Sequence, residues 1–343
     1  MEQEPLLDVK NLHVSFKTHG GEVKAVRGVS FSLEKGETLA IVGESGCGKS
    51  ATSLAVMGLI PEPPGRITEG VISFKGRDMV KMSPKQKRRI QGVNLSMIFQ
   101  DPMTALNPTL TIGSQLTEGI VHQKKATKTQ ARDKAMEMLA LVGISNPEER
   151  MKQYPHQFSG GMRQRIVIAM ALICEPDLII ADEPTTALDV TIQAQILELF
   201  NKIQKETDVA IIMITHDLGV VAKVADRIAV MYAGKIVELG AKRDIFYRSG
   251  HPYTQALLNS VVRLDLPSDT LRPINGAPPD LFLPPAGCAF SQRCPFAMEV
   301  CEHVQPPTTT LDAHHAVDCW LLDKRAVENR QRVENLQNQG ESF

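Results

Sequence analysis

Apolar and polar residues alternate along the first forty positions of the chain, with the two-residue period of a half-buried strand. The alternation runs through residues 12–16 and again through residues 23–26 and 29–33, and Gly20-Gly21 supplies a turn between the first two of these segments. We therefore predict antiparallel strands over residues 5–40.

Farther along, the apolar positions form short continuous runs, which are typical of strands buried on both faces of a parallel sheet. These runs are Leu39–Val42, Met97–Phe99, Leu178–Ala181, Val209–Ile214 and Ile228–Tyr232. Helical patterns such as Thr191–Ile203 separate the last three runs, and a helix is expected from Lys49 to about Leu59. Strands that alternate with helices predict an α/β core with a parallel sheet.

The stretch between Gln100 and about Ile173 has mostly helical periodicity, with segments at 112–122, 130–142 and 162–173. This pattern predicts a helical subdomain of about residues 101–173 inserted into the α/β core. Prolines crowd the chain after Asn259, apolar periodicity fades, and four of the six cysteines lie there. We divide the chain into a large domain (1–259), a small Cys/Pro-rich region (260–323) and a polar tail (324–343).

The charges nearly cancel, with a formal net charge of −1, so no broad basic surface for nucleic acid is expected. The longest apolar runs are strand-sized and fall short of the ~18 residues of a membrane span. The acidic start, Met1–Pro5, does not resemble a signal peptide. We expect a cytosolic chain that reaches a membrane only by docking on another subunit.

A phosphate-binding loop is the first candidate site. Residues 43–50 fit G-x-x-x-x-G-K-[ST] between a predicted strand and a predicted helix. Such a loop turns successive amides toward phosphate oxygens at the positive end of a helix. Lys49 would reach the β- and γ-phosphates, and the Ser50 hydroxyl would bind Mg²⁺. The simpler alternative is a glycine turn with an incidental lysine. The expected nucleotide contacts are Gly43, Ser45, Gly46, Cys47, Gly48, Lys49 and Ser50.

An acidic pair, Asp182-Glu183, ends a predicted buried strand. A carboxylate in that position is costly without a nearby cation, so Asp182 is a candidate Mg²⁺ ligand. The alternative is an acidic pair that only caps the chain before Pro184.

A Ser-Gly-Gly turn opens the predicted helix from about Met162. Ser159 is a natural N-cap, and Gly160 and Gly161 allow a close backbone approach to an anion. A purely structural helix cap is the alternative. With its flanking residues, Phe158 to Arg165, this turn resembles the signature motif of the ATP-binding-cassette (ABC) ATPases.

The resemblance extends to motifs spanning Phe16 to His216 in the order that this family has. It implies that Gln100 contacts metal or water, that Asp182 holds Mg²⁺, and that Glu183 polarises the attacking water. It also implies that His216 senses the γ-phosphate, that Asp189 links paired sites, and that Phe16 stacks on adenine. Ser159, Gly160 and Gly161 would complete the nucleotide site of a partner cassette. The family consensus is Leu-Ser-Gly-Gly-Gln, so Phe158 and Met162 depart from it.

Three further segments narrow the resemblance to the D-type ATPases of oligopeptide and dipeptide permeases. They are Met97–Pro108, Tyr154-Pro155-His156 and His251-Pro252-Tyr253-Thr254. This branch implies a homologous F-type ATPase partner, two membrane permease subunits and an extracytoplasmic peptide-binding protein, with the chain on the cytoplasmic face of the membrane. Importers of nickel or glutathione remain open, as does a non-transport ABC ATPase that acts on nucleic acid.

Four cysteines, Cys288, Cys294, Cys301 and Cys319, are separated by five, six and seventeen residues and fit no C-x-x-C zinc pattern. Disulfides are not expected in a cytosolic chain, whereas a bound metal could hold together a segment that lacks a periodic core. Some permease ATPases that resemble this region carry a [4Fe–4S] cluster there. The other possibilities are zinc, bound with His303, His314 or His315, and free thiols.

Overall fold

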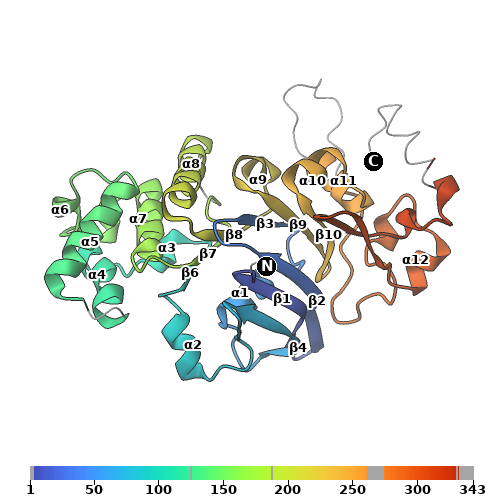
Figure 1. Cartoon of the computed structure of the whole chain (residues 1–343), viewed down its shortest axis with the longest axis horizontal. Helices are drawn as coiled ribbons and strands as arrows, with labels where there is room; N and C mark the ends of the chain where they lie inside the picture. The colour runs from blue at the N-terminus through green and yellow to red at the C-terminus, as the bar shows by residue number, and fades with distance from the viewer. Residues whose placement is uncertain (1–3, 124–125, 187, 261–273, 330, 332–343) are drawn as a thin grey trace.

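The computed structural model describes residues 4–123, 126–186, 188–260, 274–329 and 331. In this part of the chain the strands form one four-stranded and one eight-stranded sheet (Figure 1). The helices of residues 102–172 gather at one end of the molecule, and the segment after residue 274 lies at the other end. The expected α/β architecture, with a separate antiparallel sheet and a helical group, is confirmed.

The four-stranded sheet has the order β2-β1-β4-β5. Its strands are β1 (Leu7–Thr18), β2 (Gly21–Leu33), β4 (Gly65–Phe74) and β5 (Arg77–Asp78). Leu12 and Val14 are fully buried, as their alternation predicts. The two apolar pieces at 23–26 and 29–33 belong to the single strand β2, and β4 was not predicted.

The eight-stranded sheet has the order β11-β12-β10-β9-β3-β8-β7-β6. Its strands are β3 (Thr38–Val42), β6 (Leu95–Ile98), β7 (Leu178–Asp182), β8 (Ala210–Thr215), β9 (Arg227–Tyr232), β10 (Lys235–Ala241), β11 (Thr308–Asp312) and β12 (His315–Asp318). β3 pairs in parallel with β8 and β9, and β7 pairs in parallel with β6 and β8. The carboxyl ends of β3, β7 and β8 therefore share one edge, where ligands of open parallel sheets bind.

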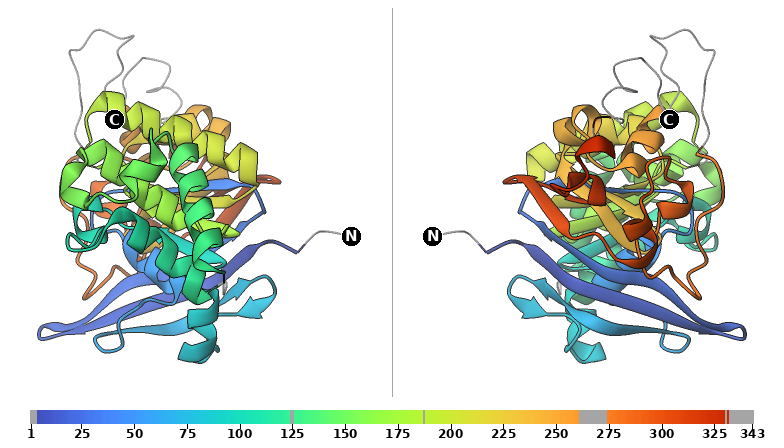
Figure 2. Two further views of the ribbon diagram at one scale, coloured as in Figure 1. Left: turned by 90° about the vertical axis from the view of Figure 1, so that its left-hand side faces the viewer. Right: turned by 90° about the vertical axis from the view of Figure 1, so that its right-hand side faces the viewer.

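Most of the helices bury an apolar side against these sheets or against one another. They are α1 (Lys49–Met57), α2 (Pro84–Ile90), α3 (Pro102–Ala105), α4 (Ile112–Gln123), α5 (Lys128–Leu141), α6 (Pro147–Arg150), α7 (Gly160–Leu172), α8 (Val190–Thr207), α9 (Leu218–Val224), α10 (Lys242–Tyr247), α11 (Pro252–Asn259) and α12 (Glu299–His303). Figure 2 shows the green helical group facing the viewer in one view and the orange-red C-terminal segment in the other.

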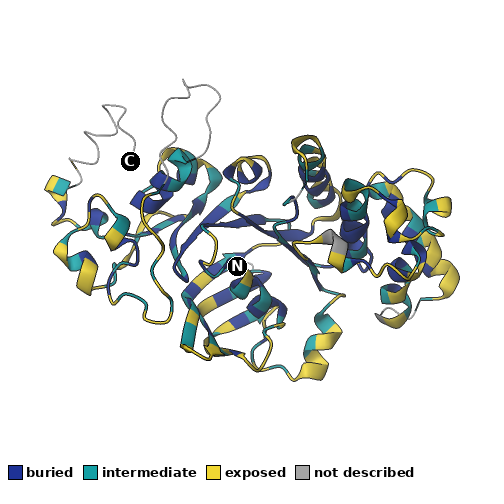
Figure 3. Ribbon diagram, turned by 180° about the vertical axis from the view of Figure 1, so that it is seen from behind, coloured by how far each residue is buried: buried dark blue, intermediate teal, exposed yellow. Residues whose placement is uncertain are grey.

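The helical group shares a core with the main sheet. Leu116 of α4, Leu139 of α5 and Ile166 of α7 are fully buried in one cluster that also contains Ile179 of β7. Burial is concentrated in the sheet strands and on the helix sides that face them, whereas the loops and outer helix surfaces are exposed (Figure 3). This shared core fixes the position of α7 relative to the acidic pair at the end of β7.

The C-terminal segment joins the main sheet, although its sequence has little periodicity. β12 pairs with β10 through Glu238↔Val317, and β11 pairs with β12. Glu238 is fully buried and accepts hydrogen bonds from the backbone amides of Gly250 and His251, at 2.7 and 3.1 Å. His315 Nε2 lies 2.8 Å from the same carboxylate, and this contact raises the pKa of His315.

Candidate nucleotide site

The phosphate loop connects β3 to α1 and has the tight backbone that such a loop needs. Gly43 and Gly48 have φ of 154° and 102°, and a Cβ on them would lie 2.2 and 2.3 Å from the carbonyl oxygens of Met231 and Ala25. Lys49 Nζ donates to the carbonyl oxygens of Gly43 and Glu44 at 2.8 and 2.9 Å. The loop is therefore closed around the lysine, with its amides at the amino end of α1.

The side chain of Cys47 is buried, although its backbone belongs to the phosphate loop. The side chain is buried in the core shared by the antiparallel sheet and α1, and its Sγ lies 3.8 Å from Lys49 Nζ. Burial raises the pKa of the Cys47 thiol, because a thiolate there would lose its hydration.

Asp182 ends β7 beside the loop, and its carboxylate accepts a hydrogen bond of 3.4 Å from the Ser50 hydroxyl. Burial raises the pKa of Asp182, and the neighbouring Glu183 acts in the same direction. A divalent cation between Ser50 and Asp182 would favour the charged form, so this pair is the arrangement that could hold Mg²⁺.

Glu183 is the centre of a polar network. Its Oε2 accepts from Gln100 Nε2 and Thr186 Oγ1, both at 2.9 Å, and its Oε1 lies 3.2 Å from His216 Nδ1. Burial alone would raise the pKa of Glu183, but the hydrogen bonds from His216 and Thr186 outweigh it and lower the pKa. The result is a partly buried carboxylate that stays ionised at the edge of the phosphate loop.

The backbone of Glu183 is also specialised. The residue adopts φ 49°, in the left-handed region, and its amide donates to the carbonyl oxygen of Ile214 at 2.9 Å. A non-glycine residue in this region is uncommon and is held there by its surroundings. The conformation turns the side chain toward residues that follow two other strands, Gln100 after β6 and His216 after β8.

The Ser-Gly-Gly turn begins α7 as expected, with Ser159 Oγ accepting from the Met162 amide at 3.4 Å. A Cβ on Gly160 would meet no other heavy atom within 4 Å in the described chain, whereas one on Gly161 would lie 2.7 Å from Ile192 Cγ2. Phe158 is buried beneath the guanidinium of Arg150, 5.6 Å from its ring centre. The departure from the family consensus at this position therefore changes core packing.

Two candidate nucleotide contacts have structural roles in this chain. Asp189 caps α8, with Oδ1 accepting from the Ile192 amide at 3.0 Å. Phe16 is half-buried in β1, where a Cβ on Gly65 would lie 2.7 Å from its ring. Their parts in linking sites and in stacking on adenine stay predictions.

Several contacts at the site were not found from the sequence. Thr186 lies one turn after Glu183, and only its spacing could have suggested its hydrogen bond. Gln164 Nε2 of α7 donates to the carbonyl oxygen of Pro184 at 2.8 Å and connects the Ser-Gly-Gly helix to the acidic pair. Arg293 forms an ion pair with Glu44 of the phosphate loop, with atoms 2.6 and 2.9 Å apart. No sequence signal connects two residues so far apart along the chain.

The four C-terminal cysteines come together. They line a narrow cavity with His251, Phe290, Phe296, Trp320 and Leu321. Burial raises the pKa of Cys288, Cys294 and Cys319, to about 12 for Cys294. Backbone amides oppose this rise: those of Phe290 and Ser291 bond to Cys288, that of Phe296 to Cys294, and that of Leu321 to Cys319.

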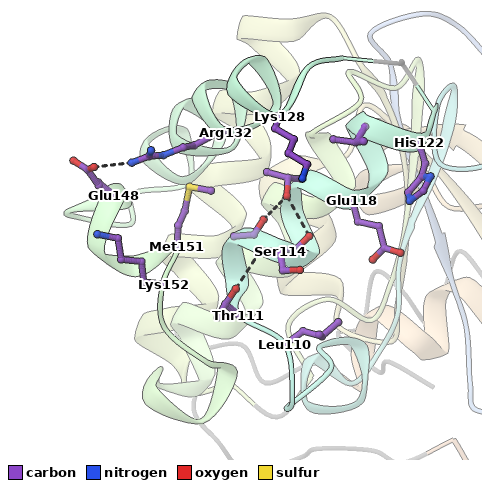
Figure 4. Close-up of a pocket in the computed structure, with 13 residues that line it drawn as sticks. Leu110, Thr111, Ser114, Glu118, His122, Lys128, Arg132, Glu148, Met151 and Lys152 are labelled. Carbon is purple, nitrogen blue, oxygen red and sulfur yellow. Dashed lines mark hydrogen bonds and ion pairs between the residues drawn. The ribbon is translucent and has the colours of Figure 1, made fainter.

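A further hollow, of about 860 Å³, lies between α4 and α5 and has a mixed polar and apolar lining (Figure 4). Arg132 and Glu148 form an ion pair of 2.7 Å at its rim. The lining includes none of the residues of the nucleotide motifs, so this hollow is separate from the candidate nucleotide site.

Similarity to known protein families agrees with the nucleotide site that the geometry indicates. Residues 26–186 match the family described as ABC transporter, and residues 237–301 match the family described as oligopeptide/dipeptide transporter, C-terminal region. The chain is 65% identical to the dipeptide transport ATP-binding protein DppD of Bacillus subtilis, over 94% of this chain and 96% of that protein. It is 57% identical to the oligopeptide transport ATP-binding protein OppD of the same organism, over 92% and 89%.

A solved structure of the ATP-binding cassette MJ0796, a dimer bound to ADP and Pi in a post-hydrolysis state, has a TM-score of 0.62 to this chain. It is 26% identical and covers 69% of this chain and 99% of its own. Among the helices that the structure describes, none is long and apolar enough to cross a bilayer. Sequence, fold and site geometry together show that this chain belongs to the ABC transporter ATP-binding proteins, in the branch that carries the oligopeptide/dipeptide transporter C-terminal region.

Proposed function

We propose that this chain is the ATP-hydrolysing subunit of a membrane importer for dipeptides and oligopeptides. The observation that carries the motor role is the Glu183 carboxylate, hydrogen-bonded to Gln100, Thr186 and His216 beside the phosphate loop. The substrate class comes from the dipeptide and oligopeptide transport proteins that the chain resembles over nine-tenths of its length.

Lys49, Glu183 and His216 each have a separate role in hydrolysis. Lys49, which now donates to two loop carbonyls, turns to the β- and γ-phosphates when ATP enters. Glu183 accepts a hydrogen bond from the attacking water and orients it toward the γ-phosphorus. The water oxygen bonds to that phosphorus while the bond to ADP breaks, and a proton of the water passes to the released phosphate. Lys49 and His216 stabilise the charge that spreads over the phosphate oxygens.

Ser50, Asp182 and Gln100 would hold Mg²⁺, which supplies charge neutralisation at the β- and γ-phosphates. The hydrogen bond between Ser50 and Asp182 already brings the first two side chains together. Gln100 is tied to the same site through Glu183.

A partner completes the site. Gly160 faces open space in the part of the chain that the structure describes, so the Ser-Gly-Gly turn is free to cover a nucleotide held by a second cassette. We assign that role to a homologous F-type ATPase, so that ATP binding closes the pair and hydrolysis reopens it. The pair docks on two permease subunits at the cytoplasmic face of the membrane, and an extracytoplasmic peptide-binding protein delivers the substrate.

We propose that the permease subunits dock next to Gln100. A hollow of about 410 Å³ is lined there by Phe99, Thr104 and Met170, among others, and Phe99 is 47% exposed. An exposed aromatic ring beside a hollow at a catalytic loop fits a helix of a membrane subunit, which could then move Gln100.

Uptake by the assembled transporter tests the function. The chain, co-purified with its membrane subunits and reconstituted in vesicles, is expected to drive uptake of a radiolabelled dipeptide only with MgATP on its own side. Nickel and glutathione are the competing substrates to include. Uptake of either one without peptide uptake would favour the alternative importers, and ATPase activity stimulated by DNA alone would favour a role on nucleic acid.

We further infer a [4Fe–4S] cluster at the four cysteines. The four thiols line one cavity with His251, and their spacing in the sequence fits no C-x-x-C zinc pattern. The amide donors at Cys288, Cys294 and Cys319 suit thiolates bound to a metal group.

His251 supports the same assignment. Its Nδ1 accepts from the Tyr253 amide at 3.0 Å, so Nε2 carries the proton of the neutral ring. Nε2 is buried, belongs to a residue that lines the cavity, and has no hydrogen-bond partner in the described structure. A buried donor without a partner fits an acceptor inside the cavity, such as a cluster sulfur.

The chain purified without oxygen is expected to contain about four iron and about four acid-labile sulfide per molecule. Cys294→Ser removes one thiolate and should lower both contents severalfold, whereas Cys174→Ser, at a buried thiol outside the cavity, should leave them unchanged. Elemental analysis and the visible spectrum measure this. Stoichiometric zinc, or no metal in a folded chain, would contradict the cluster.

A further inference from the structure

Glu44 is the second residue of the phosphate loop, and its carboxylate, its amide and its carbonyl all form hydrogen bonds. Its carboxylate binds Arg293, with Nη1–Oε2 at 2.6 Å and Nη2–Oε1 at 2.9 Å. Its amide donates to Tyr253 Oη at 3.0 Å, and its carbonyl accepts from Lys49 at 2.9 Å. Two of these three partners come from beyond residue 250, outside the loop and the strands beside it.

Arg293 is itself held in one position. Its side chain is 4% exposed, and its guanidinium lies over the rings of Tyr232 and Phe290, 5.7 and 5.9 Å from their centres. Nε and Nη2 donate to the carbonyl oxygens of Asn275 and Ile274, at 2.9 and 3.0 Å. Because these contacts already hold the planar guanidinium of Arg293, it can form both hydrogen bonds to the Glu44 carboxylate with little further loss of side-chain entropy.

The segment that carries Arg293 is bounded by two of the four cysteines. It consists of the short 3-10 turn Ser291–Arg293, which lies between Cys288 and Cys294. Cys288 and Cys294 line the cavity at either end of the turn. Tyr253, like Arg293, is close in sequence to a residue that lines this cavity, because His251 lies two residues before it.

We propose that Arg293 is a positioning residue for the phosphate loop, and that the turn between Cys288 and Cys294 makes MgATP affinity depend on what the four cysteines bind. With the cysteines bound to a metal group, the turn is fixed at both ends and Arg293 holds Glu44. Without the group, the turn loses its anchors at Cys288 and Cys294, and the phosphate loop becomes free to relax. The second half of this proposal rests on the metal site proposed above.

The first test removes the ion pair. Arg293→Met keeps most of the apolar packing and leaves Glu44, whose side chain is 26% exposed, able to reach water. In the assembled transporter we expect KM for MgATP to rise about tenfold, while kcat changes less than about twofold. Arg325→Met is the matched control, because among the residues that the structure describes the Arg325 side chain pairs only with the nearby Asp323. Arg293→Lys should restore part of the affinity.

Glu44→Gln weakens the same ion pair from the side of the loop. In the double variant, which combines it with Arg293→Met, KM for MgATP should be little higher than in either single variant. A role that only supports folding would lower kcat through a smaller active fraction and leave KM unchanged, and that result would overturn the positioning role. Additive effects of the two substitutions would overturn it too.

The second test varies the metal site. MgATP affinity of the full chain is measured before and after the metal is removed with a chelator, with metal content determined in each sample. We expect removal to weaken affinity severalfold in the natural chain and to have little effect in Arg293→Met. Unchanged affinity in the natural chain would overturn the dependence on the metal site. A chain that never contains metal would overturn that dependence and the metal site itself, while the first test would still decide the role of Arg293.

Discussion

Glu183→Gln should lower ATP turnover at least about a hundredfold while MgATP binding stays near its natural strength. Glu183 Oε2 accepts from both Gln100 and Thr186, and Oε1 faces His216. The amide of glutamine has nearly the same shape but no negative charge and only one accepting oxygen. It can no longer satisfy these donors and polarise a water, whereas the phosphate loop is unchanged.

The measurement is steady-state ATPase activity of the assembled transporter, with nucleotide retention as the binding readout. Glu175→Gln is a matched control, since it makes the same chemical change just before β7 instead of just after it, at a carboxylate that pairs with Lys134. We expect that control to keep full turnover. Turnover above a tenth of the natural rate in Glu183→Gln would show that another group polarises the attacking water.

Gly160→Asp should strongly lower the ATPase activity of the assembled pair without disturbing the fold of this chain. A Cβ at Gly160 meets nothing within 4 Å in the described structure, and the first turn of a helix accepts an aspartate well. The added carboxylate would face the phosphates of a nucleotide held by the partner. Charge repulsion and the lost backbone approach should lower turnover about a hundredfold, by preventing closure.

Gly160→Asp should affect only the nucleotide site that this chain shares with its partner. MgATP binding at this chain's own phosphate loop, measured on the chain alone, should be unchanged. Gly119→Asp is the control, because a Cβ there meets only Cys174 Sγ at 3.9 Å and α4 lies outside the nucleotide motifs. Natural turnover in an assembly that contains Gly160→Asp would show that the Ser-Gly-Gly turn only caps α7.

Most of the site could be predicted because its parts are local in sequence. The phosphate loop, the acidic pair and His216 each follow a buried apolar strand, and parallel strands bring their carboxyl ends to one edge. What the pattern could not supply was the hydrogen bonding around Glu183, such as that from Thr186, because short polar side chains leave no periodic signal. The left-handed backbone of Glu183 is likewise set by its surroundings and not by its residue type.

The C-terminal region was the least predictable part of the fold. β11 is mostly exposed, with the sequence Thr308–Asp312, so it has no apolar alternation to reveal a strand. The contact between Arg293 and Glu44 depends on tertiary packing of the whole region. The grouping of the four cysteines was expected from their number and not from their spacing.

The pairing of β12 with β10 bears on how this protein can be shortened. A chain cut after residue 259 would lose β11 and β12 and leave β10 as an unprotected sheet edge, with its backbone groups open to other chains. It would also leave the fully buried Glu238 without His315. Such a fragment would contain every nucleotide motif, and we expect it to aggregate, so that the ATPase domain needs the C-terminal region in order to stay folded and dissolved.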